Sequence, residues 1–175
     1  MAKTLYLLRH AKSSWADAGL EDAARPLAKR GRKAGRRMGR ELARRGWLPD
    51  LVLCSTAMRT RETFARLSKG IEAAEPGATP EVVFEDGLYL AGAAALLARA
   101  RTLDDAIRSV LFIGHNPGLQ DFALALAPKG EGRARIEAKF PTSALAVIRF
   151  EGEGWASLAR GAGHLEAALY PRDLD

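Results

Sequence analysis

Two short, uninterrupted apolar segments place the strongest constraint on what this chain can fold into. Residues 5–8 (Leu-Tyr-Leu-Leu) and 110–113 (Val-Leu-Phe-Ile) have the length of strands. A strand that is apolar on both faces must be covered on both sides, which is typical of a parallel sheet lying between two layers of helices. We therefore expect an α/β fold, a three-layer αβα sandwich with a mostly parallel central sheet.

Periodicity predicts alternating strands and helices around these two segments. Strands are expected at residues 4–8, 51–54, 82–84, 110–113, 144–150 and 155–160, and helices at about 27–45, 58–68, 93–101 and after Pro117. Residues 152–154 (Gly-Glu-Gly) are typical of a hairpin turn, so the last two strands predict an antiparallel edge strand. With 175 residues and no repeat or long linker, residues 1–175 are expected to form a single domain.

Cysteine and histidine usage narrows the kinds of site that the chain can hold. The single cysteine, Cys54, leaves no partner for an intramolecular disulfide and excludes a zinc site built from two cysteines. The three histidines show neither i, i+4 spacing nor an H-E-x-x-H motif, so we expect no metal and no other cofactor. The apolar run near the N-terminus is too short for a signal peptide or a membrane span, which favours a cytoplasmic protein.

Positive charge is concentrated in one segment. The chain has a net charge of +6, but residues 25–45 hold ten basic side chains and one acid, a net charge of +9 that leaves −3 for the remainder. Leu27, Gly31, Ala34, Met38 and Leu42 recur at helical spacing, so the segment predicts an amphipathic helix. Such charge runs usually face solvent, and the alternative is a docking surface for an acidic partner. No stacking aromatics or nucleic-acid motif accompany it, so we do not expect nucleic acid as a partner. The short apolar run near the N-terminus likewise gives no reason to expect a membrane as a partner.

Basic and imidazole side chains follow three of the expected strands. Arg9 and His10 come directly after the first strand, Arg59 follows the second, and His115 follows the strand at residues 110–113. The carboxyl ends of parallel strands lie at one edge of the sheet, where open α/β folds bind ligands. Arginine forks match phosphate oxygens, a neutral imidazole can attack phosphorus, and a second imidazole can stabilise the transferring oxygens. The four side chains together predict a phosphoryl-transfer site.

Asn116 and Pro117 are typical of the start of a helix, which would place His115 beside free backbone amides that favour an anion. Taken singly, a histidine at the end of a buried strand is more often a hydrogen-bonded structural residue than a catalyst. Their joint placement at strand ends is what favours function. His164 has no such neighbours and is expected to be structural or at the surface.

Short motifs in a fixed order resemble the histidine phosphatase superfamily, whose larger members include the phosphoglycerate mutases. They are Arg9-His10 followed by Ser13 and Trp15, then Ser55 with Arg59-Thr60, and later Gly114-His115. The finer pattern at residues 9–13, 25–27, 30–31, 49–51 and 141–142 looks like the short branch named for the SixA phosphohistidine phosphatase. The resemblance spans residues 4 to about 150.

This resemblance implies a phosphoglycerate mutase-like fold and a metal-independent phosphatase with a phosphohistidine intermediate. By the resemblance, His10 is the nucleophile, Arg9 and Arg59 bind the phosphate, and His115 stabilises the transferring group. Ser13 is a further candidate for substrate binding, and Asn116 is another. The implied substrate is phosphohistidine in a protein, with small phosphorylated metabolites as the alternative. A mutase is less expected because the chain is short.

The proton donor for the leaving group is not assigned by the resemblance. Larger members use a carboxylic acid from a loop that corresponds to residues 85–89 here, where Glu85 and Asp86 are both candidates. An imidazole leaving group is a much weaker base than an alkoxide and needs such a donor less, which favours phosphohistidine. A missing acid would also suit a module that binds phosphoproteins without turning them over.

A cysteine-based phosphatase is a rival interpretation of Cys54 and Arg59. Those enzymes hold a thiolate and an arginine in one loop with five residues between them, whereas only four intervene here. Cys54 ends a strand and is more simply interpreted as a small buried hydrophobe. The sequence also lacks the motifs of serine hydrolases, nucleoside triphosphatases and dinucleotide enzymes.

Overall fold

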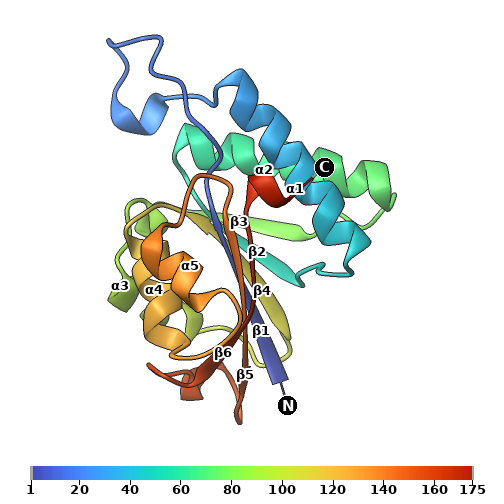
Figure 1. The fold of residues 1–175 in the computed structure, drawn as a ribbon, viewed down its shortest axis with the longest axis vertical. Helices are drawn as coiled ribbons and strands as arrows, with labels where there is room; N and C mark the ends of the chain where they lie inside the picture. Colours follow the sequence, from blue (N-terminus) through green and yellow to red (C-terminus); the bar gives the residue numbers. More distant parts are fainter. Residues whose placement is uncertain (1, 175) are drawn as a thin grey trace.

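A six-stranded sheet with the order β3-β2-β4-β1-β5-β6 forms the centre of the structure, a computed structural model that describes residues 2–174 (Figure 1). The strands β3, β2, β4 and β1 are mutually parallel, whereas β5 and β6 are antiparallel to their neighbours. The expected mostly parallel sheet is confirmed, and its antiparallel edge comprises two strands. The strands are β1 (Ala2–Arg9), β2 (Leu51–Ser55), β3 (Glu81–Glu85), β4 (Ser109–Gly114), β5 (Leu145–Glu151) and β6 (Gly163–Leu169).

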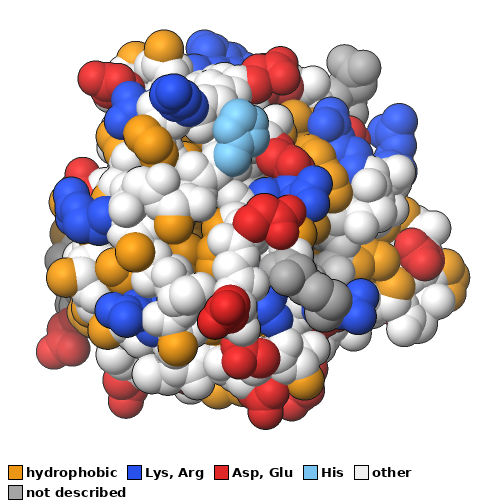
Figure 2. Space-filling model, turned by 90° about the horizontal axis from the view of Figure 1, so that it is seen from below, with side chains coloured by type: hydrophobic (Ala, Val, Ile, Leu, Met, Phe, Trp, Pro, Cys, Tyr) orange, Lys and Arg blue, Asp and Glu red, His pale blue; other side chains and the backbone are white. Residues whose placement is uncertain are grey.

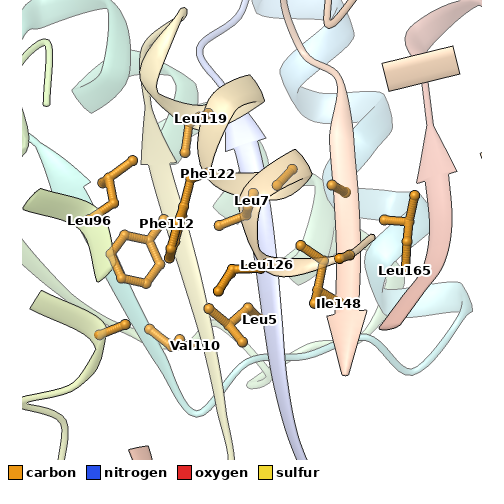
Figure 3. Packing of buried hydrophobic residues seen from close by; sticks show 14 of the residues in the cluster. Leu5, Leu7, Leu96, Val110, Phe112, Leu119, Phe122, Leu126, Ile148 and Leu165 are labelled. Carbon is orange, nitrogen blue, oxygen red and sulfur yellow. The ribbon is translucent and has the colours of Figure 1, made fainter. Parts of the chain in front are cut away.

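Two groups of helices cover the two faces of this sheet, which confirms the αβα sandwich. Tyr6 and Leu8 pack with residues of α1 and α2 on one face. Leu5 and Leu7, which alternate with them along β1, pack with α3, α4 and α5 on the other face, and Figure 3 shows this second cluster. The helices are α1 (Lys29–Arg44), α2 (Met58–Ala74), α3 (Ala93–Ala100), α4 (Gly118–Leu126) and α5 (Arg133–Ala138). Within residues 2–174, none of the helices is long and apolar enough to cross a membrane.

The C-terminal part of the chain differs from the prediction. Residues 155–160 do not form a strand, because Trp155–Ser157 is a 3-10 helix and the last strand begins at Gly163. The Trp155 side chain is fully buried, and its indole nitrogen donates to the carbonyl oxygen of Ile107 at 2.7 Å. Burial of this large ring fixes a helical turn where periodicity suggested extended backbone. Residues 152–154 are therefore not a tight hairpin turn, and the short helix α5 was not predicted.

Helices α1 and α2 are in direct backbone contact because glycines lie at their interface. A Cβ atom added at Gly39 would lie 2.0 Å from the carbonyl oxygen of Leu67, and one added at Gly70 would lie 2.0 Å from that of Arg36. The predicted apolar stripe of α1 is buried at Met38 and Leu42. At these glycines the interface with α2 leaves no room for a larger side chain. The charged side chains of α1 therefore lie on its other faces.

Replacing Gly39 with alanine should destabilise the protein. The added methyl group would collide with the backbone of α2, which cannot yield as a flexible side chain would, and such overpacking costs ~1–3 kcal/mol even though alanine favours helices. Urea unfolding would measure the change in the free energy of unfolding. Gly87→Ala is the matched control, because its Cβ would meet nothing within 4 Å, and a shift of similar size there would contradict the steric explanation.

Candidate active site

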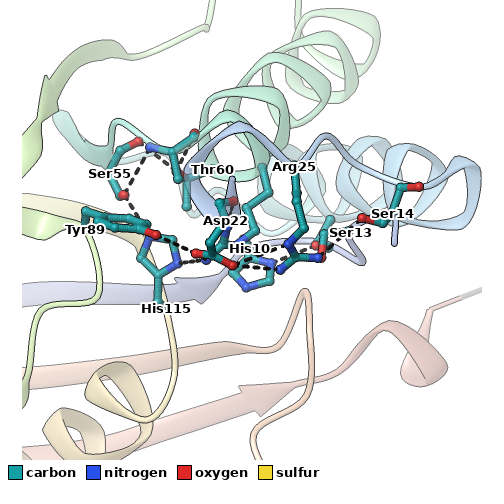
Figure 4. A network of polar contacts seen from close by, with 12 residues as sticks. His10, Ser13, Ser14, Asp22, Arg25, Ser55, Thr60, Tyr89 and His115 are labelled. Carbon is teal, nitrogen blue, oxygen red and sulfur yellow. Dashed lines mark hydrogen bonds and ion pairs between the residues drawn. The ribbon is translucent and has the colours of Figure 1, made fainter. Parts of the chain in front are cut away.

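The predicted phosphoryl-binding side chains gather at the edge where the parallel strands end, and Figure 4 shows His10 and His115 there. Arg9 is the last residue of β1 and is followed by His10, Arg59 lies in the first turn of α2, and His115 directly follows β4. The imidazole rings of His10 and His115 lie 5.5 Å apart between centroids. Nη2 of Arg59 lies 3.4 Å from Nδ1 of His115. Three strands thus bring together groups that are far apart in the sequence.

Backbone contacts fix the orientation and tautomer of His10. Its Nδ1 lies 2.8 Å from the carbonyl oxygen of Ala11, and because a carbonyl only accepts, the neutral ring carries its proton on Nδ1. Nε2 then keeps its lone pair. The side chain is only 7% exposed, and the backbone N–H of Ala11 is held by the hydroxyl of Thr63 at 2.9 Å. His10 is therefore held with one unprotonated ring nitrogen, which is the state that a nucleophile requires.

His115 carries its proton on the opposite nitrogen. Its Nδ1 faces Nη2 of Arg59, and because a guanidinium only donates, Nδ1 is the acceptor. Nε2 consequently bears the hydrogen and donates to Oγ of Ser55 at 2.7 Å. Ser55 ends β2 and is fully buried, so the sheet itself sets the position of this ring.

Burial keeps both histidines neutral. It lowers the pKa of His10 to about 4, with Arg59, Arg9 and Arg25 adding to the effect and the hydrogen bond to Ala11 opposing it. Burial also lowers the pKa of His115 to about 3, assisted by neighbouring His10 and Arg59. A pair of neutral imidazoles beside guanidinium groups is poised to receive an anion rather than a cation.

Two arginines of the site retain buried donors that no group in residues 2–174 satisfies. Nε of Arg9 and Nε of Arg59 are buried and have no hydrogen-bond partner among the described residues. Nη1 of Arg9 donates to the carbonyl oxygen of Phe140 at 3.1 Å, which anchors that side chain. Burial, and then the nearby Arg59, lower the pKa of Arg9. Buried donors without partners are rare and costly, so their concentration here indicates a place for a ligand with acceptor oxygens.

A carboxylate that the sequence analysis missed lies in the middle of this cluster. Asp22, in a 3-10 turn after β1, accepts from Nη2 of Arg59 at 3.0 Å, from the hydroxyl of Tyr89 at 2.5 Å and from the guanidinium of Arg25 at 3.3 Å. Its backbone carbonyl accepts from Nη1 of Arg59 at 2.8 Å. The hydroxyl of Tyr89 in first place, and then the two arginines, lower the pKa of Asp22 to about 2. Residues 21–24 are exposed. They show neither the alternation of a strand nor a position at the end of one, so neither pattern indicated Asp22 as a site residue.

Arg25 belongs to this site and not to the basic helix, which begins at Lys29. Its guanidinium is buried, stacks 3.5 Å from the Trp15 ring centroid and donates to Oγ of Ser13 at 2.8 Å. Ser13, predicted to contact substrate, thus also positions Arg25. The Arg-Pro-Leu segment was recognised only as part of a family pattern, although a buried arginine beside a serine is itself a signal for an anion site.

Asn116 does not cap α4 as its position before Pro117 suggested. Its amide nitrogen donates to the carbonyl oxygen of Phe140 at 3.0 Å and to Oε1 of Gln120 at 3.2 Å. The same Phe140 carbonyl also accepts from Arg9, so Asn116 helps to fix the segment that holds this arginine. The buried Oδ1 of Asn116 has no partner among the described residues.

The two carboxylates considered as proton donors have other partners. Glu85 forms a three-bond pair with the guanidinium of Arg99 at 2.8–3.2 Å. Asp86 is exposed and accepts from the hydroxyl of Thr56 at 2.6 Å. Among the contacts of residues 2–174, neither carboxylate touches His10 or His115. The structure therefore does not bring them into the cluster formed by the other predicted residues.

Cys54 is placed as a core residue. It is fully buried, its thiol lies 3.4 Å from the carbonyl oxygens of Ser55 and Thr60, and burial raises its pKa to about 12. A thiol in this state is not a nucleophile. The exposed His164 lies in β6 and outside the cluster.

The two buried histidines predict an acid-labile protein. Their folded-state pKa values of about 4 and 3 lie below the unfolded value near 6.5, so between pH 6.5 and 4 the unfolded chain binds more protons and the free energy of unfolding falls as pH falls. In His10→Gln, the slope of that free energy against pH near pH 5 should be smaller by ~1.4 kcal/mol per pH unit, one proton's worth. Denaturant unfolding at several pH values measures it. His164→Gln is the control, and an unchanged slope in His10→Gln would contradict the assignment.

Comparisons with known proteins show the family to which the chain belongs. The model of the histidine phosphatase superfamily (branch 1) matches residues 5–83. An uncharacterized protein of Mycobacterium tuberculosis is 36% identical, covering 94% of this chain and 100% of its own. A solved structure from Nakamurella multipartitia, named as a candidate phosphohistidine phosphatase SixA, is 30% identical with a TM-score of 0.81 and covers 98% of this chain and 97% of its own.

A second solved structure carries a similar name. It is a candidate SixA phosphohistidine phosphatase from Agrobacterium tumefaciens, 30% identical with a TM-score of 0.76, and the match covers 97% of this chain and 98% of that one. Sequence identity at this level over nearly the whole of both chains, together with the fold, shows common descent. The chain belongs to the histidine phosphatase superfamily and is SixA-like.

Proposed function

We propose that the protein is a phosphatase that hydrolyses phosphohistidine in protein substrates through a phosphorylated His10. The observation that carries this proposal is the state of His10: a buried, neutral imidazole with Nε2 unprotonated, beside two arginines whose buried Nε–H groups have no partner among the described residues. Membership of the histidine phosphatase superfamily supports the hydrolase class. The named SixA neighbours support phosphohistidine as the substrate.

In the proposed first step, Nε2 of His10 attacks phosphorus in line with the leaving group. An N–P bond forms on His10, the bond between phosphorus and the leaving atom breaks, and its electron pair goes to the leaving group. Arg9 and Arg59 bind the equatorial oxygens, where negative charge is spread in the transition state. In the second step, water attacks the same phosphorus and returns His10 to its neutral form with release of inorganic phosphate.

His115 acts on the transferring oxygens in this proposal. Its Nδ1 accepts from Arg59 in the present structure, and an incoming phosphoryl dianion would raise its pKa by favouring the charged ring. Once protonated, Nδ1 becomes a donor toward the phosphoryl oxygens. Because Nε2 remains bonded to Ser55, the ring would keep its position through this change.

The leaving group decides between the two substrate classes. Asp22 is the carboxylate of the cluster, and its pKa of about 2 keeps it ionised, while Glu85 is paired with Arg99. A site without a protonated carboxyl group suits an imidazole leaving group, which departs as a weak base, better than an alkoxide. This supports phosphohistidine over phosphate esters.

A comparison of matched substrates tests the proposal. Two peptides of one sequence, one with phosphohistidine and the other with phosphoserine at the same position, would be compared by phosphate release. We expect kcat/KM for the phosphohistidine peptide to be larger by a factor of ~100 or more, the usual worth of a general acid. An equal or higher value for the ester would support a phosphatase of small phosphorylated metabolites. If phosphate is released from neither peptide, the remaining alternative is a module that binds phosphoproteins without turning them over.

Asp22→Asn should strengthen the binding of inorganic phosphate. The Asp22 carboxylate holds the same Arg59 nitrogen that a phosphoryl group needs, so the two anions compete. Removal of one partly exposed competing charge should lower the dissociation constant roughly 3- to 10-fold in isothermal titration. Glu21→Gln, on the same exposed turn, removes an equal charge and should leave the constant unchanged. Equal effects in both variants would point to net charge instead of competition.

A further inference from the structure

A second cationic region lies beside the proposed phosphoryl site, at the same edge of the sheet. A cavity of about 420 Å³ opens between α1, the end of α5 and the segments that flank β5 and β6. Its walls include residue 12, which follows β1, residues 141–143, which precede β5, and residues 170–172, which follow β6. Because β5 and β6 are antiparallel, these segments meet the ends of the parallel strands at one edge.

Five basic side chains line this cavity, and no carboxylate does. The acid Asp173 lies outside the lining and pairs with Arg135 at 2.7 Å. In the described part of the chain, the four other cations make no ion pair within 4.0 Å. The basic lining residues are Lys12, Arg30, Arg135, Lys139 and Arg172. Like charges converging on a partly enclosed space raise its positive potential and favour an anionic occupant.

The walls between these charges are apolar and fixed. The Tyr170 ring is buried, its hydroxyl donates to the carbonyl oxygen of Lys139, and the guanidinium of Arg135 lies 3.8 Å from the ring centroid. Ala34, Ala138 and two prolines are the other apolar lining residues, and the polar Thr142 and Ser143 complete the lining. An occupant with a methylene stem and an anionic end, such as a glutamate side chain, matches apolar walls with basic groups around them.

Ser143 connects this cavity to the reaction centre. Its backbone N–H donates to the carbonyl oxygens of Arg9 and His10 at 3.1 Å, while the residue forms part of the cavity wall. Its hydroxyl is buried and has no hydrogen-bond partner among residues 2–174. Lys12 lies two residues beyond His10, a span of at most ~7 Å in extended chain. An extended peptide with its phosphohistidine at His10 therefore reaches the cavity within a few residues.

We propose that this cavity binds acidic side chains of the phosphoprotein substrate, two to four residues from the phosphohistidine. The inference rests on the proposed function and adds sequence specificity to it. The opposite end of the molecule does not share the one-sided charge of the cavity. Figure 2 shows that end, where basic and acidic side chains are interspersed. Most basic side chains of α1, including Lys33, Arg36 and Arg40, lie outside the cavity lining.

Peptide binding tests the inference without requiring turnover. Two labelled peptides with an unphosphorylated central histidine, flanked at two to four residues by glutamate or by glutamine, would be titrated with the protein and followed by fluorescence anisotropy. We expect the glutamate peptide to bind about 10-fold more tightly at low salt, with a smaller difference at high salt. Lys139→Ala combined with Arg172→Ala should abolish the difference. Arg36→Ala combined with Arg40→Ala removes the same charge from the exposed face of α1 and should preserve it.

Three results would overturn the inference: equal affinity for both peptides, a preference that survives the Lys139 and Arg172 substitutions, or an equal loss in the Arg36 and Arg40 control. The phosphorylated forms of the same peptides separate this inference from the function on which it rests. Wild-type kcat/KM should favour the glutamate peptide by a similar factor, and the double cavity variant should keep wild-type turnover of the glutamine peptide. Selective binding without any phosphate release would refute the proposed function and leave the acidic-peptide site in place.

Discussion

His10→Ala should abolish phosphate release and leave the protein folded. The substitution removes the only atom proposed to bond to phosphorus, so kcat should fall by a factor on the order of 10^4 or more. Loss of the Nδ1 hydrogen bond to Ala11 is a local change, and loss of a buried imidazole that resists protonation offsets part of its cost. Circular dichroism and urea unfolding would show whether the fold is retained.

Trapping the phosphorylated His10 intermediate would test the proposed role of His10 directly. Acid-quenched turnover followed by mass spectrometry should show a phosphorylated peptide containing His10 in the wild-type protein and none in His10→Ala. His164→Ala, which removes the exposed histidine, is the control and should form the intermediate normally. Wild-type turnover in His10→Ala, or phosphate trapped on another residue, would refute the mechanism.

Arg59→Ala should lower kcat by a factor on the order of 10^2 or more. Arg59 is 3% exposed, contacts His115 and Asp22, and carries a buried Nε–H without a described partner, so its charge acts in a largely water-free site. If it stabilises mainly the transition state, KM should change less than kcat. Steady-state kinetics with the phosphohistidine peptide measures both constants.

Two further variants distinguish the roles of charge and shape at this position. Arg59→Lys retains the charge without the planar fork and should recover only part of the activity. Arg61→Ala removes a neighbouring exposed arginine that donates to the backbone of Thr56, and it should leave kcat within about twofold. An unchanged kcat in Arg59→Ala, or an equal loss in Arg61→Ala, would place Arg59 outside the reacting group.

Local pattern predicted most of the fold because most of the core is built from continuous apolar strands and one glycine-containing helical stripe. The segments at residues 5–8 and 110–113 are central strands covered on both faces, as their composition indicated, and the structure shows that they are neighbours, β1 and β4. The failure at residues 155–160 has a tertiary cause, since the position of Trp155 is set by Ile107 and Asp105, which are distant in sequence. Periodicity carries no information on such contacts.

The candidate site likewise contains residues that the local sequence predicted and one that it did not. Arg9, His10, Arg59 and His115 could be anticipated because each ends or follows a strand, or opens a helix, at one edge of the sheet. Asp22 could not, because it lies in an exposed turn and enters the cluster only through long-range contacts with Tyr89 and Arg59. The carboxylate that pairs with Arg59 in this structure therefore could not be predicted from its local sequence.

The lack of a side chain at Gly31 lets the basic helix pack directly against the backbone of the segment that follows His10. A Cβ atom there would lie 2.1 Å from the carbonyl oxygen of Lys12, and the same carbonyl accepts from the backbone N–H of Ala28 at 2.8 Å. The first turn of α1 is thus pressed against the loop that continues from His10. Charge changes along the outer face of α1 should leave His10 in place, whereas one methyl group at position 31 should displace the backbone of Lys12, two residues beyond His10. In the proposed mechanism, the position of His10 would thus depend on a residue that has no functional group.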